Sequence, residues 1–522
     1  MRLKDQTKRA RLKRIAIRAG KIIACAGCGA VLALLVLGIN SLNDKPDLDL
    51  WHTVRLKEEF TASSPEDTFD EYLKLEERLF TGLEREVYDR TGAAEGVSIN
   101  RYERGSRSDP ARWSRNWNRS YELAPESASG KPEAAVLLIH GLSDSPYSLH
   151  HLGERLQAGG AYVLGLRVPG HGTVPAALTR TKWEDMAAAV ELAMRHLQER
   201  SGGRPLYVVG YSNGGALAVQ YALSALEESE LPMPDGIVLI SPEIGVSKMA
   251  SGFIWQERVG RLLGLKKLAW TSVNPEYDPF KYNSFPANAG NLAHELTTVN
   301  REQVAALAEA GALDDLPPVI AFQSAVDATV SVTALVSDLF ARLPANHHEL
   351  VVFDLNRNPV VGALLGTDPK DEIGLVLDDP TRAFEFTVLT NASAMDERVV
   401  VRSWAPGQGA YVQADTGMRW PPRIYSLSHV ALPFPGDDPL YGAVGKAESA
   451  GFQIGAAALR GEKGVLRIPA QEVLRQRWNP FYPYLERRVL ERFGLVGTVE
   501  SSGAAGASEG GRDRRLEDGE QP

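Results

Sequence analysis

The amino-acid sequence predicts an α/β fold in which a mostly parallel sheet carries helices on both faces. From about residue 95, short runs rich in Val, Ile and Leu alternate with stretches of helical periodicity. Strands buried on both faces give such runs, and their alternation with helices is typical of a parallel sheet. Strands are expected at 134–139, 161–166, 206–209, 236–240, 319–322 and 350–353, and helices near 148–157, 183–199, 214–226 and 332–342.

The composition of the 522-residue chain is that of a globular protein. Hydrophobic residues make up 44% and charged residues 24%, so a sizeable core can be buried. The formal net charge is −9, whereas a protein that binds nucleic acid needs a concentrated basic surface. The charge therefore argues against nucleic acid as a partner.

The N-terminus differs from the rest of the chain. Residues 1–21 are strongly basic, and residues 22–39 form an uncharged apolar run about long enough to cross a bilayer as a helix. Because basic residues before such a span stay in the cytoplasm, we expect a single transmembrane anchor with the remaining chain outside. An uncleaved anchor is favoured over a signal peptide, since no small-x-small site follows the run. Cys25 and Cys28 lie within it and are interpreted as packing residues.

The remaining boundaries follow from local composition. Residues 40–125 are predicted to be a linker followed by an N-terminal packing helix and strands, residues 126–498 the α/β domain, and residues 499–522 a disordered tail. The packing helix is expected to begin at Ser64-Pro65-Glu66-Asp67, a sequence typical of a helix start. The apolar face of this helix comprises Phe69, Tyr72, Leu73, Leu79, Phe80, Leu83 and Val87.

Two stretches interrupt the alternation of strands and helices. Residues 243–316 contain many aromatic and apolar side chains, and an insertion over the carboxyl end of a sheet would act as a lid. Residues 355–425 contain strand-like segments at 384–389 and 398–401. We expect this second insertion to add a small β-extension, to which the sequence assigns no function.

Ser212 is the candidate nucleophile. It lies in Gly210-Tyr211-Ser212-Asn213-Gly214, which matches G-x-S-x-G and stands between an expected strand and an expected helix. This strand–turn–helix context is what a nucleophile elbow requires, and the glycines allow a sharp turn. The hydroxyl would then lie at a helix N-terminus, where the helix dipole favours developing negative charge.

Two backbone N–H groups are the candidate oxyanion hole. His140-Gly141-Leu142 follows the expected strand 134–139, and the N–H of Leu142 is the first predicted donor. The second is the N–H of Asn213, directly after the candidate nucleophile. His140 is interpreted as a structural residue rather than a base, as is His171 in the Gly170-His171-Gly172 loop.

His429 and Asp327 are the predicted base and acid. The expected chain order is Ser, acid, His, and catalytic groups follow the carboxyl ends of strands. His294 lies in the expected lid, and His347 and His348 precede a strand, which leaves His429 as the best candidate. Asp327 follows the strand 319–322.

Glu243, after the strand 236–240, is kept as the alternative acid. With either acid, the serine would attack an acyl carbonyl, the histidine would take its proton, and water would clear the acyl-enzyme. This chemistry requires no metal and no cofactor.

These motifs together resemble a known family. Ile139-His140-Gly141-Leu142, Pro169-Gly170-His171-Gly172, the motif at Ser212, Val326-Asp327 and Ser428-His429 are similar to the monoacylglycerol lipase and carboxylesterase branch of the α/β hydrolases, the serine aminopeptidase S33-like group. The resemblance covers roughly 130–355 and 420–495. It implies an eight-stranded sheet and a cap inserted after the sixth strand. The long separation of Asp327 from His429 departs from the family pattern.

The sequence thus predicts a membrane-anchored serine hydrolase that cleaves carboxylic esters, with an esterase-like or lipase-like activity. The substrate is expected to be a small ester with an apolar acyl or alcohol part. A peptidase, a thioesterase or an acyltransferase is the alternative on the same fold, because a fold does not fix the reaction. A membrane-tethered binding protein without catalysis is the third hypothesis.

Overall fold

The computed structural model describes residues 45–125, 131–245, 265–366, 368–443, 453–455 and 470–496. Within these residues, no helix combines the length and the apolar character that a bilayer crossing needs. This finding contradicts the expected location as a single-pass membrane protein with an external domain. The apolar run 22–39, on which that expectation depended, lies outside the described residues, as do the 1–21 segment and the 499–522 tail.

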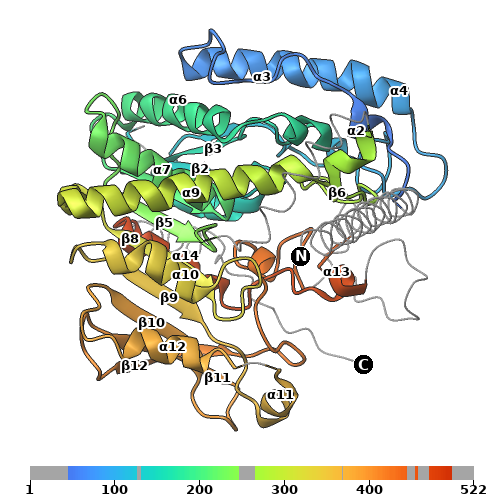
Figure 1. The fold of residues 1–522 in the computed structure, drawn as a ribbon. Helices are drawn as coiled ribbons and strands as arrows, with labels where there is room; N and C mark the ends of the chain where they lie inside the picture. The colour runs from blue at the N-terminus through green and yellow to red at the C-terminus, as the bar shows by residue number, and fades with distance from the viewer. Residues whose placement is uncertain are drawn as a thin grey trace, which may run out of the picture.

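A twisted sheet forms the centre of the fold (Figure 1). Its strand order is β1-β3-β2-β4-β5-β8-β9-β10-β11-β12. The seven strands from β3 to β10 in this order run parallel, while β1, β11 and β12 are antiparallel to their neighbours. The predicted, mostly parallel α/β sheet is therefore confirmed. The strands are β1 (Tyr121–Leu123), β2 (Ala134–Ile139), β3 (Ala161–Leu166), β4 (Leu206–Tyr211), β5 (Gly236–Ile240), β8 (Val319–Ser324), β9 (Glu349–Phe353), β10 (Glu385–Asn391), β11 (Arg398–Trp404) and β12 (Val412–Arg419).

The expected number of eight strands is not confirmed, because the sheet has ten strands in the described part of the chain. The difference comes largely from residues 355–425. β10 pairs parallel with β9, and β11 and β12 follow it as an antiparallel extension at the sheet edge. The second insertion therefore continues the main sheet.

Helices cover both faces of the sheet, as predicted. In β2, Ala135, Leu137 and Ile139 face one hydrophobic core, and the alternate residues face the other. α3 (Phe69–Leu83), α6 (Trp183–Ser201), α7 (Asn213–Glu227), α9 (Ala287–Ala310), α10 (Val332–Asp338) and α12 (Lys370–Leu377) contribute to the first core, and α5 (His150–Ala158) and α14 (Tyr482–Arg492) to the second. The smaller elements are α2 (Leu50–Thr53), α4 (Asp89–Thr91), α11 (Pro359–Leu364), α13 (Ala470–Leu474), β6 (Trp270–Ser272) and β7 (Phe285–Pro286).

The expected lid over residues 243–316 is not confirmed. Its longest described element is α9, which lies in the same layer as α6 and α7 (Figure 1). Leu292 and Leu296 are buried in the core, and the Asn300 side chain donates a 2.8 Å hydrogen bond to the Ala216 carbonyl on α7. α9 is therefore a structural helix of the fold. Trp270, Tyr277 and Phe280 of the expected lid are also buried, whereas Phe253 and Trp255 belong to residues 246–264, which lie outside the described residues.

The N-terminal packing helix α3 begins later than predicted. Thr68 caps it, because its hydroxyl accepts a hydrogen bond from the Glu71 N–H at 3.3 Å. The Ser64 hydroxyl accepts instead from the Thr61 N–H at 2.9 Å and so stabilises a preceding turn. The predicted apolar face of α3 is nevertheless the buried one.

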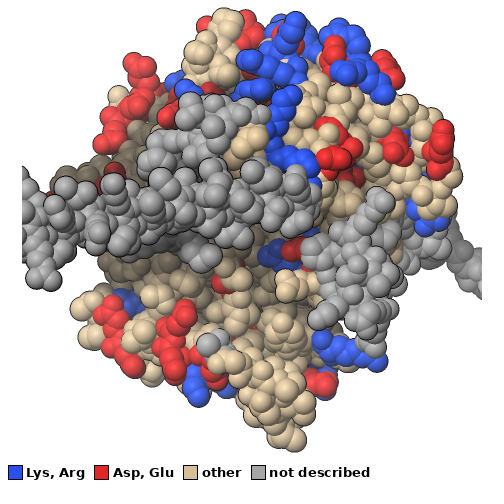
Figure 2. Space-filling model, turned by 45° about the vertical axis from the view of Figure 1, so that its right-hand side comes forward, with Lys and Arg blue, Asp and Glu red and all other residues tan. Residues whose placement is uncertain are grey.

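Arg167 joins α3 and its flanking segment to the end of β3. Its guanidinium is 1% exposed and lies 3.0 Å from both Glu76 on α3 and Glu59 before it. It also donates to the His171 carbonyl at 3.1 Å. Most other ion pairs lie at the surface, where Figure 2 shows acidic and basic side chains interspersed on one face. Arg167 is therefore the main electrostatic link between the N-terminal segment and the sheet.

Replacing Arg167 with Met should lower the free energy of unfolding by about 3–5 kcal/mol, because Glu76 would remain buried without its cation. Arg78→Met is the matched control, since Arg78 pairs with Glu58 and Glu66 at the surface and should contribute less than about 1 kcal/mol. Urea unfolding followed by circular dichroism measures both. Equal losses in the two variants would contradict this assignment.

Candidate active site

Ser212 lies in a sharp turn between β4 and α7. Its backbone has φ 54° and ψ −118°, a conformation that costs free energy for any residue with a Cβ. The turn is held because the Ser212 N–H donates to the Ile240 carbonyl at 3.0 Å, and the Glu243 N–H donates to the Ser212 carbonyl at 2.9 Å. The serine thus lies at the N-terminus of α7, where the sequence placed it.

Glycine is required on both sides of Ser212. A Cβ on Gly210 would lie 2.3 Å from the Gly214 carbonyl oxygen, and a Cβ on Gly214 would lie 2.1 Å from the Ile139 carbonyl oxygen. Both contacts are with backbone atoms, which cannot rotate away as a side chain can. The two glycines therefore allow α7 to begin directly against the end of β2.

His429 lies between Ser212 and Asp327. Its Nε2 is 2.8 Å from the Ser212 hydroxyl oxygen, and its Nδ1 is 2.7 Å from a carboxylate oxygen of Asp327. The side chains of His429 and Asp327 are 7% and 0% exposed. Because a carboxylate accepts hydrogen bonds, Nδ1 carries the proton, and Nε2 is free to accept from the serine hydroxyl. The structure brings together the three residues that the sequence selected.

Several donors surround the Asp327 carboxylate. The N–H groups of Thr329 and Val330 donate to Oδ1 at 2.8 and 3.2 Å, and the Gln323 side chain donates to Oδ2 at 3.0 Å. Burial acts to raise the pKa of Asp327, but His429 and the backbone donors outweigh it and hold the pKa below its ordinary value. Asp327 is thus kept ionised next to the imidazole.

The insertion 355–425 does not separate Asp327 from His429 in space. After β12 the chain returns past the ends of the neighbouring strands, where the Asn356 N–H donates to the Tyr425 carbonyl at 2.8 Å. The Ser324 hydroxyl, at the end of β8, donates to the Leu427 carbonyl at 2.8 Å. His429 then begins a short 3₁₀ helix, His429–Ala431. The extra residues between Asp327 and His429 therefore extend the edge of the sheet and leave the two side chains in contact.

Glu243, the alternative acid, lies near the serine turn but is not hydrogen-bonded to the imidazole. It accepts a 3.1 Å hydrogen bond from the Asn213 side chain. Burial raises the pKa of Glu243 above its ordinary value. Its contacts indicate a role in holding the turn at Asn213, whereas Asp327 occupies the position next to His429 Nδ1.

The two expected oxyanion donors lie on neighbouring turns. Gly141 passes so close to Ser212 that a Cβ on this glycine would be 3.1 Å from the serine Cβ, and Leu142 follows directly. Asn213 is the first residue of α7, so its N–H has no acceptor within the helix. Both N–H groups therefore come from segments adjacent to the serine.

Both ring nitrogens of His140 are hydrogen-bonded to backbone groups. Its Nδ1 donates to the Gly141 carbonyl at 2.9 Å, and its Nε2 accepts from the Val168 N–H at 3.0 Å. Burial lowers the pKa of His140 well below its ordinary value, and it lowers that of His171 to about 4. His348 likewise accepts from the Val319 N–H at 3.0 Å. Val319 is the first residue of β8, so this contact lies at the opposite end of that strand from Asp327.

Two buried polar residues near this site were not predicted from the sequence. The Gln323 side chain donates to Asp327. The sequence feature that could have identified Gln323 is its place on β8, four residues before Asp327. Asp144 is buried three residues after Gly141 and lies 3.3 Å from Lys281. Burial raises the pKa of Asp144 to about 6. For Asp144, the sequence feature that could have identified it is an acidic residue in the turn that follows Gly141.

A family model described as serine aminopeptidase, S33, matches residues 130–346. This match includes Ser212 and Asp327 and ends before His429. The thermostable monoacylglycerol lipase of Bacillus sp. (strain H-257) is 29% identical over 151 residues, which are 29% of this chain and 56% of that protein. The predicted resemblance to the monoacylglycerol lipase and carboxylesterase branch of the α/β hydrolases is confirmed. The chain spans little more than half the length of this curated relative.

Two solved structures that are similar to this chain match a comparable share of it. A structure of the metagenome-derived lipolytic enzymes LipS and LipT is 22% identical, covers 46% of this chain and 88% of its own, and has a TM-score of 0.36. The monoacylglycerol lipase of Paleococcus ferrophilus is 19% identical, covers 45% of this chain and 87% of its own, and has a TM-score of 0.34.

Replacing Gly214 with Ala should lower the free energy of unfolding by about 1–3 kcal/mol, because the new methyl group would overlap the Ile139 carbonyl and force α7 away from β2. Gly82→Ala on α3 is the control: no heavy atom lies within 4 Å of its Cβ position, and Ala favours a helix by about 1 kcal/mol. Thermal unfolding of both variants checks the expectation. Stability equal to that of the unmodified chain in Gly214→Ala would contradict it.

Proposed function

We propose that this chain is a serine hydrolase that cleaves carboxylic esters through Ser212, His429 and Asp327. The observation that carries the proposal is the continuous pair of hydrogen bonds from the serine hydroxyl through both imidazole nitrogens to a buried carboxylate. Such an arrangement raises the nucleophilicity of a serine, whose hydroxyl is otherwise a weak nucleophile at neutral pH. The name of the curated relative, a monoacylglycerol lipase, supports an ester as the substrate.

The residues have the following proposed roles. His429 takes the proton of Ser212 as the hydroxyl attacks the ester carbonyl, and Asp327 stabilises the imidazolium that forms. The N–H groups of Leu142 and Asn213 stabilise the oxyanion of the tetrahedral intermediate. The imidazolium then protonates the leaving alcohol, and water attacks the acyl-enzyme by the same route. The substrate is proposed to be a small ester with an apolar acyl or alcohol part.

A peptidase is the second candidate, because the matching family model is described as a serine aminopeptidase. The same acyl-enzyme chemistry serves an amide if the leaving amine is protonated by His429. A panel of p-nitrophenyl esters, acyl thioesters and aminoacyl p-nitroanilides separates the two. Turnover of an amide without turnover of any ester would favour the peptidase.

Ser212→Ala should abolish labelling by a fluorophosphonate probe and reduce hydrolysis of p-nitrophenyl butyrate by at least about 10³-fold, because the nucleophile is removed. Ser224→Ala, a serine further along the same helix, is the control and should label as the unmodified chain does. In-gel fluorescence and absorbance at 405 nm measure the two effects. Equal labelling of Ser212→Ala and the unmodified chain would refute the proposal.

Asp327→Asn should reduce kcat by about 10⁴-fold, because an amide neither stabilises the imidazolium nor fixes the required tautomer. Glu243→Gln should change kcat by less than about tenfold, since a glutamine oxygen can still accept from Asn213. Steady-state kinetics with the same ester compares the two variants. A larger loss in Glu243→Gln would reassign the acid.

A further inference from the structure

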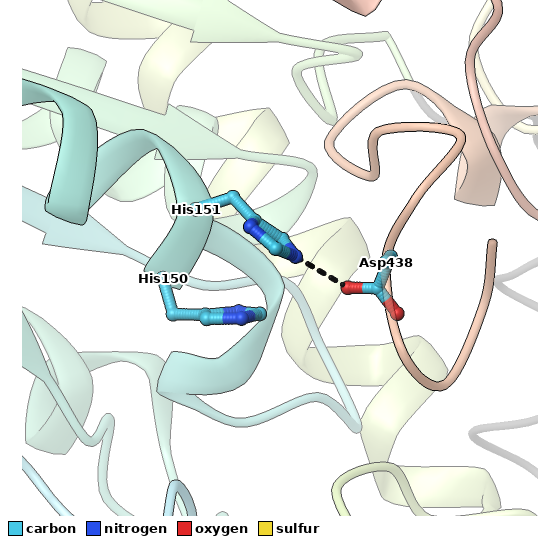
Figure 3. Close-up of side chains that lie close together, drawn as sticks. All are labelled: His150, His151 and Asp438. Carbon is cyan, nitrogen blue, oxygen red and sulfur yellow. Dashed lines mark hydrogen bonds and ion pairs between the residues drawn. The ribbon is translucent and has the colours of Figure 1, made fainter. Parts of the chain in front are cut away.

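A second group of reactive side chains lies at the start of α5, where His150 and His151 face Asp438 (Figure 3). One nitrogen or oxygen from each residue lies within 4.8 Å of the others. In the described part of the chain, this is the one such group of three or more His, Cys, Asp or Glu residues. Asp438 comes from the loop that follows His429, so the group joins two segments far apart in sequence.

His151 and Asp438 lie slightly closer together than two ligands of one ion do. The His151 Nε2 is 3.0 Å from Asp438 Oδ2. Bonds of about 2.0–2.2 Å to a tetrahedral zinc ion put neighbouring ligand atoms about 3.4 Å apart. The His151 side chain is 23% exposed, which gives an ion access from solvent, whereas the Asp438 side chain is 0% exposed.

Other contacts orient the three side chains in the way that protein metal ligands are oriented. The His150 Nδ1 donates to the Tyr147 carbonyl at 2.6 Å, so Nε2 is the nitrogen that can bind an ion. Asp438 Oδ1 accepts from the N–H groups of Leu440 and Tyr441 at 2.8 and 2.6 Å. Hydrogen bonds from the second nitrogen of a ligand histidine, and to a ligand carboxylate, are typical of metal sites.

A salt bridge alone explains only part of this arrangement. It accounts for the contact of His151 with Asp438, but not for the ring of His150, whose centroid lies 4.0 Å from that of His151. Because the His150 Nδ1 proton is donated to the Tyr147 carbonyl, the lone pair of Nε2 is available to a metal.

We propose that His150, His151 and Asp438 bind one divalent transition-metal ion, for which zinc is the natural candidate. Two nitrogens and one oxygen suit zinc with a water molecule as its fourth ligand. Calcium and magnesium prefer six or more oxygen ligands and should bind poorly here. The site is separate from the proposed ester hydrolysis, for which no metal was expected.

The ion would connect α5 to the loop after His429. Tyr147, whose carbonyl holds His150, lies in the 3₁₀ helix Pro146–Leu149, which follows the turn at Gly141 and Leu142. An ion bound here would therefore fix the position of the segments that carry His429 and Leu142. Because it binds the folded chain, it should raise the Tm.

Isothermal titration of the untagged, chelator-treated full-length chain with ZnCl₂ tests the proposal. We expect one site per chain, a rise in Tm of at least about 2 °C at saturating zinc, and visible d–d absorption bands when Co²⁺ replaces Zn²⁺. His151→Gln should weaken zinc binding by more than about 100-fold, because it removes a ligand. His294→Gln on α9 is the matched control and should bind as the unmodified chain does.

Asp438→Asn provides a second variant, and circular dichroism establishes that each variant is folded. The proposal would be overturned by the unmodified chain alone if it showed no saturable zinc binding or no Co²⁺ absorption bands. Equal zinc affinity in His151→Gln, Asp438→Asn and the unmodified chain would place the ion elsewhere and also overturn it. Binding of Mg²⁺ as tight as that of Zn²⁺ would contradict the assigned ligand set.

Discussion

The close approach of α7 to the end of β2 is the constraint on which the rest of the site depends. Ser212 has a strained backbone, and the strain is tolerated because the β4–α7 turn is fixed by hydrogen bonds to β5 and to Glu243. Gly214 lets α7 begin against the Ile139 carbonyl, and Gly141 then passes directly beside Ser212. The serine and both candidate oxyanion donors therefore have their relative positions set by backbone packing.

The position of His429, the proposed base, is set by a different part of the chain. The segment just before His429 is held by two hydrogen bonds to residues at or just after the ends of β8 and β9. The Leu427 carbonyl accepts from Ser324, and the Tyr425 carbonyl accepts from Asn356. These contacts form because β10, β11 and β12 extend the sheet and return the chain to its carboxyl edge. An insertion that is long in sequence thus has little effect on the distance between Asp327 and His429.

Much of this arrangement follows from local sequence, and the exceptions have physical causes. The buried strands were predicted to within about two residues because each is a short run of apolar side chains, and the serine turn carries its glycines in sequence. β12 escaped prediction because it is an exposed edge strand without apolar alternation. The role of α9 escaped because its burial depends on long-range contacts such as Asn300 to Ala216, which no local pattern encodes. The start of α3 was predicted too early because the Thr68 hydroxyl, and not that of Ser64, caps the helix.

The loop after His429 completes the constraint from the far side. The Phe434 carbonyl accepts from the Asn479 N–H at 2.8 Å, and the Tyr441 hydroxyl donates to the buried Asp278 at 2.6 Å. Asp438, between them, pairs with His151 at the start of α5. Each contact joins the base-bearing segment to a different element, so His429 cannot move without breaking buried polar contacts, which are costly to leave unpaired. The short 3₁₀ helix that carries His429 is therefore fixed by buried polar contacts on both of its sides.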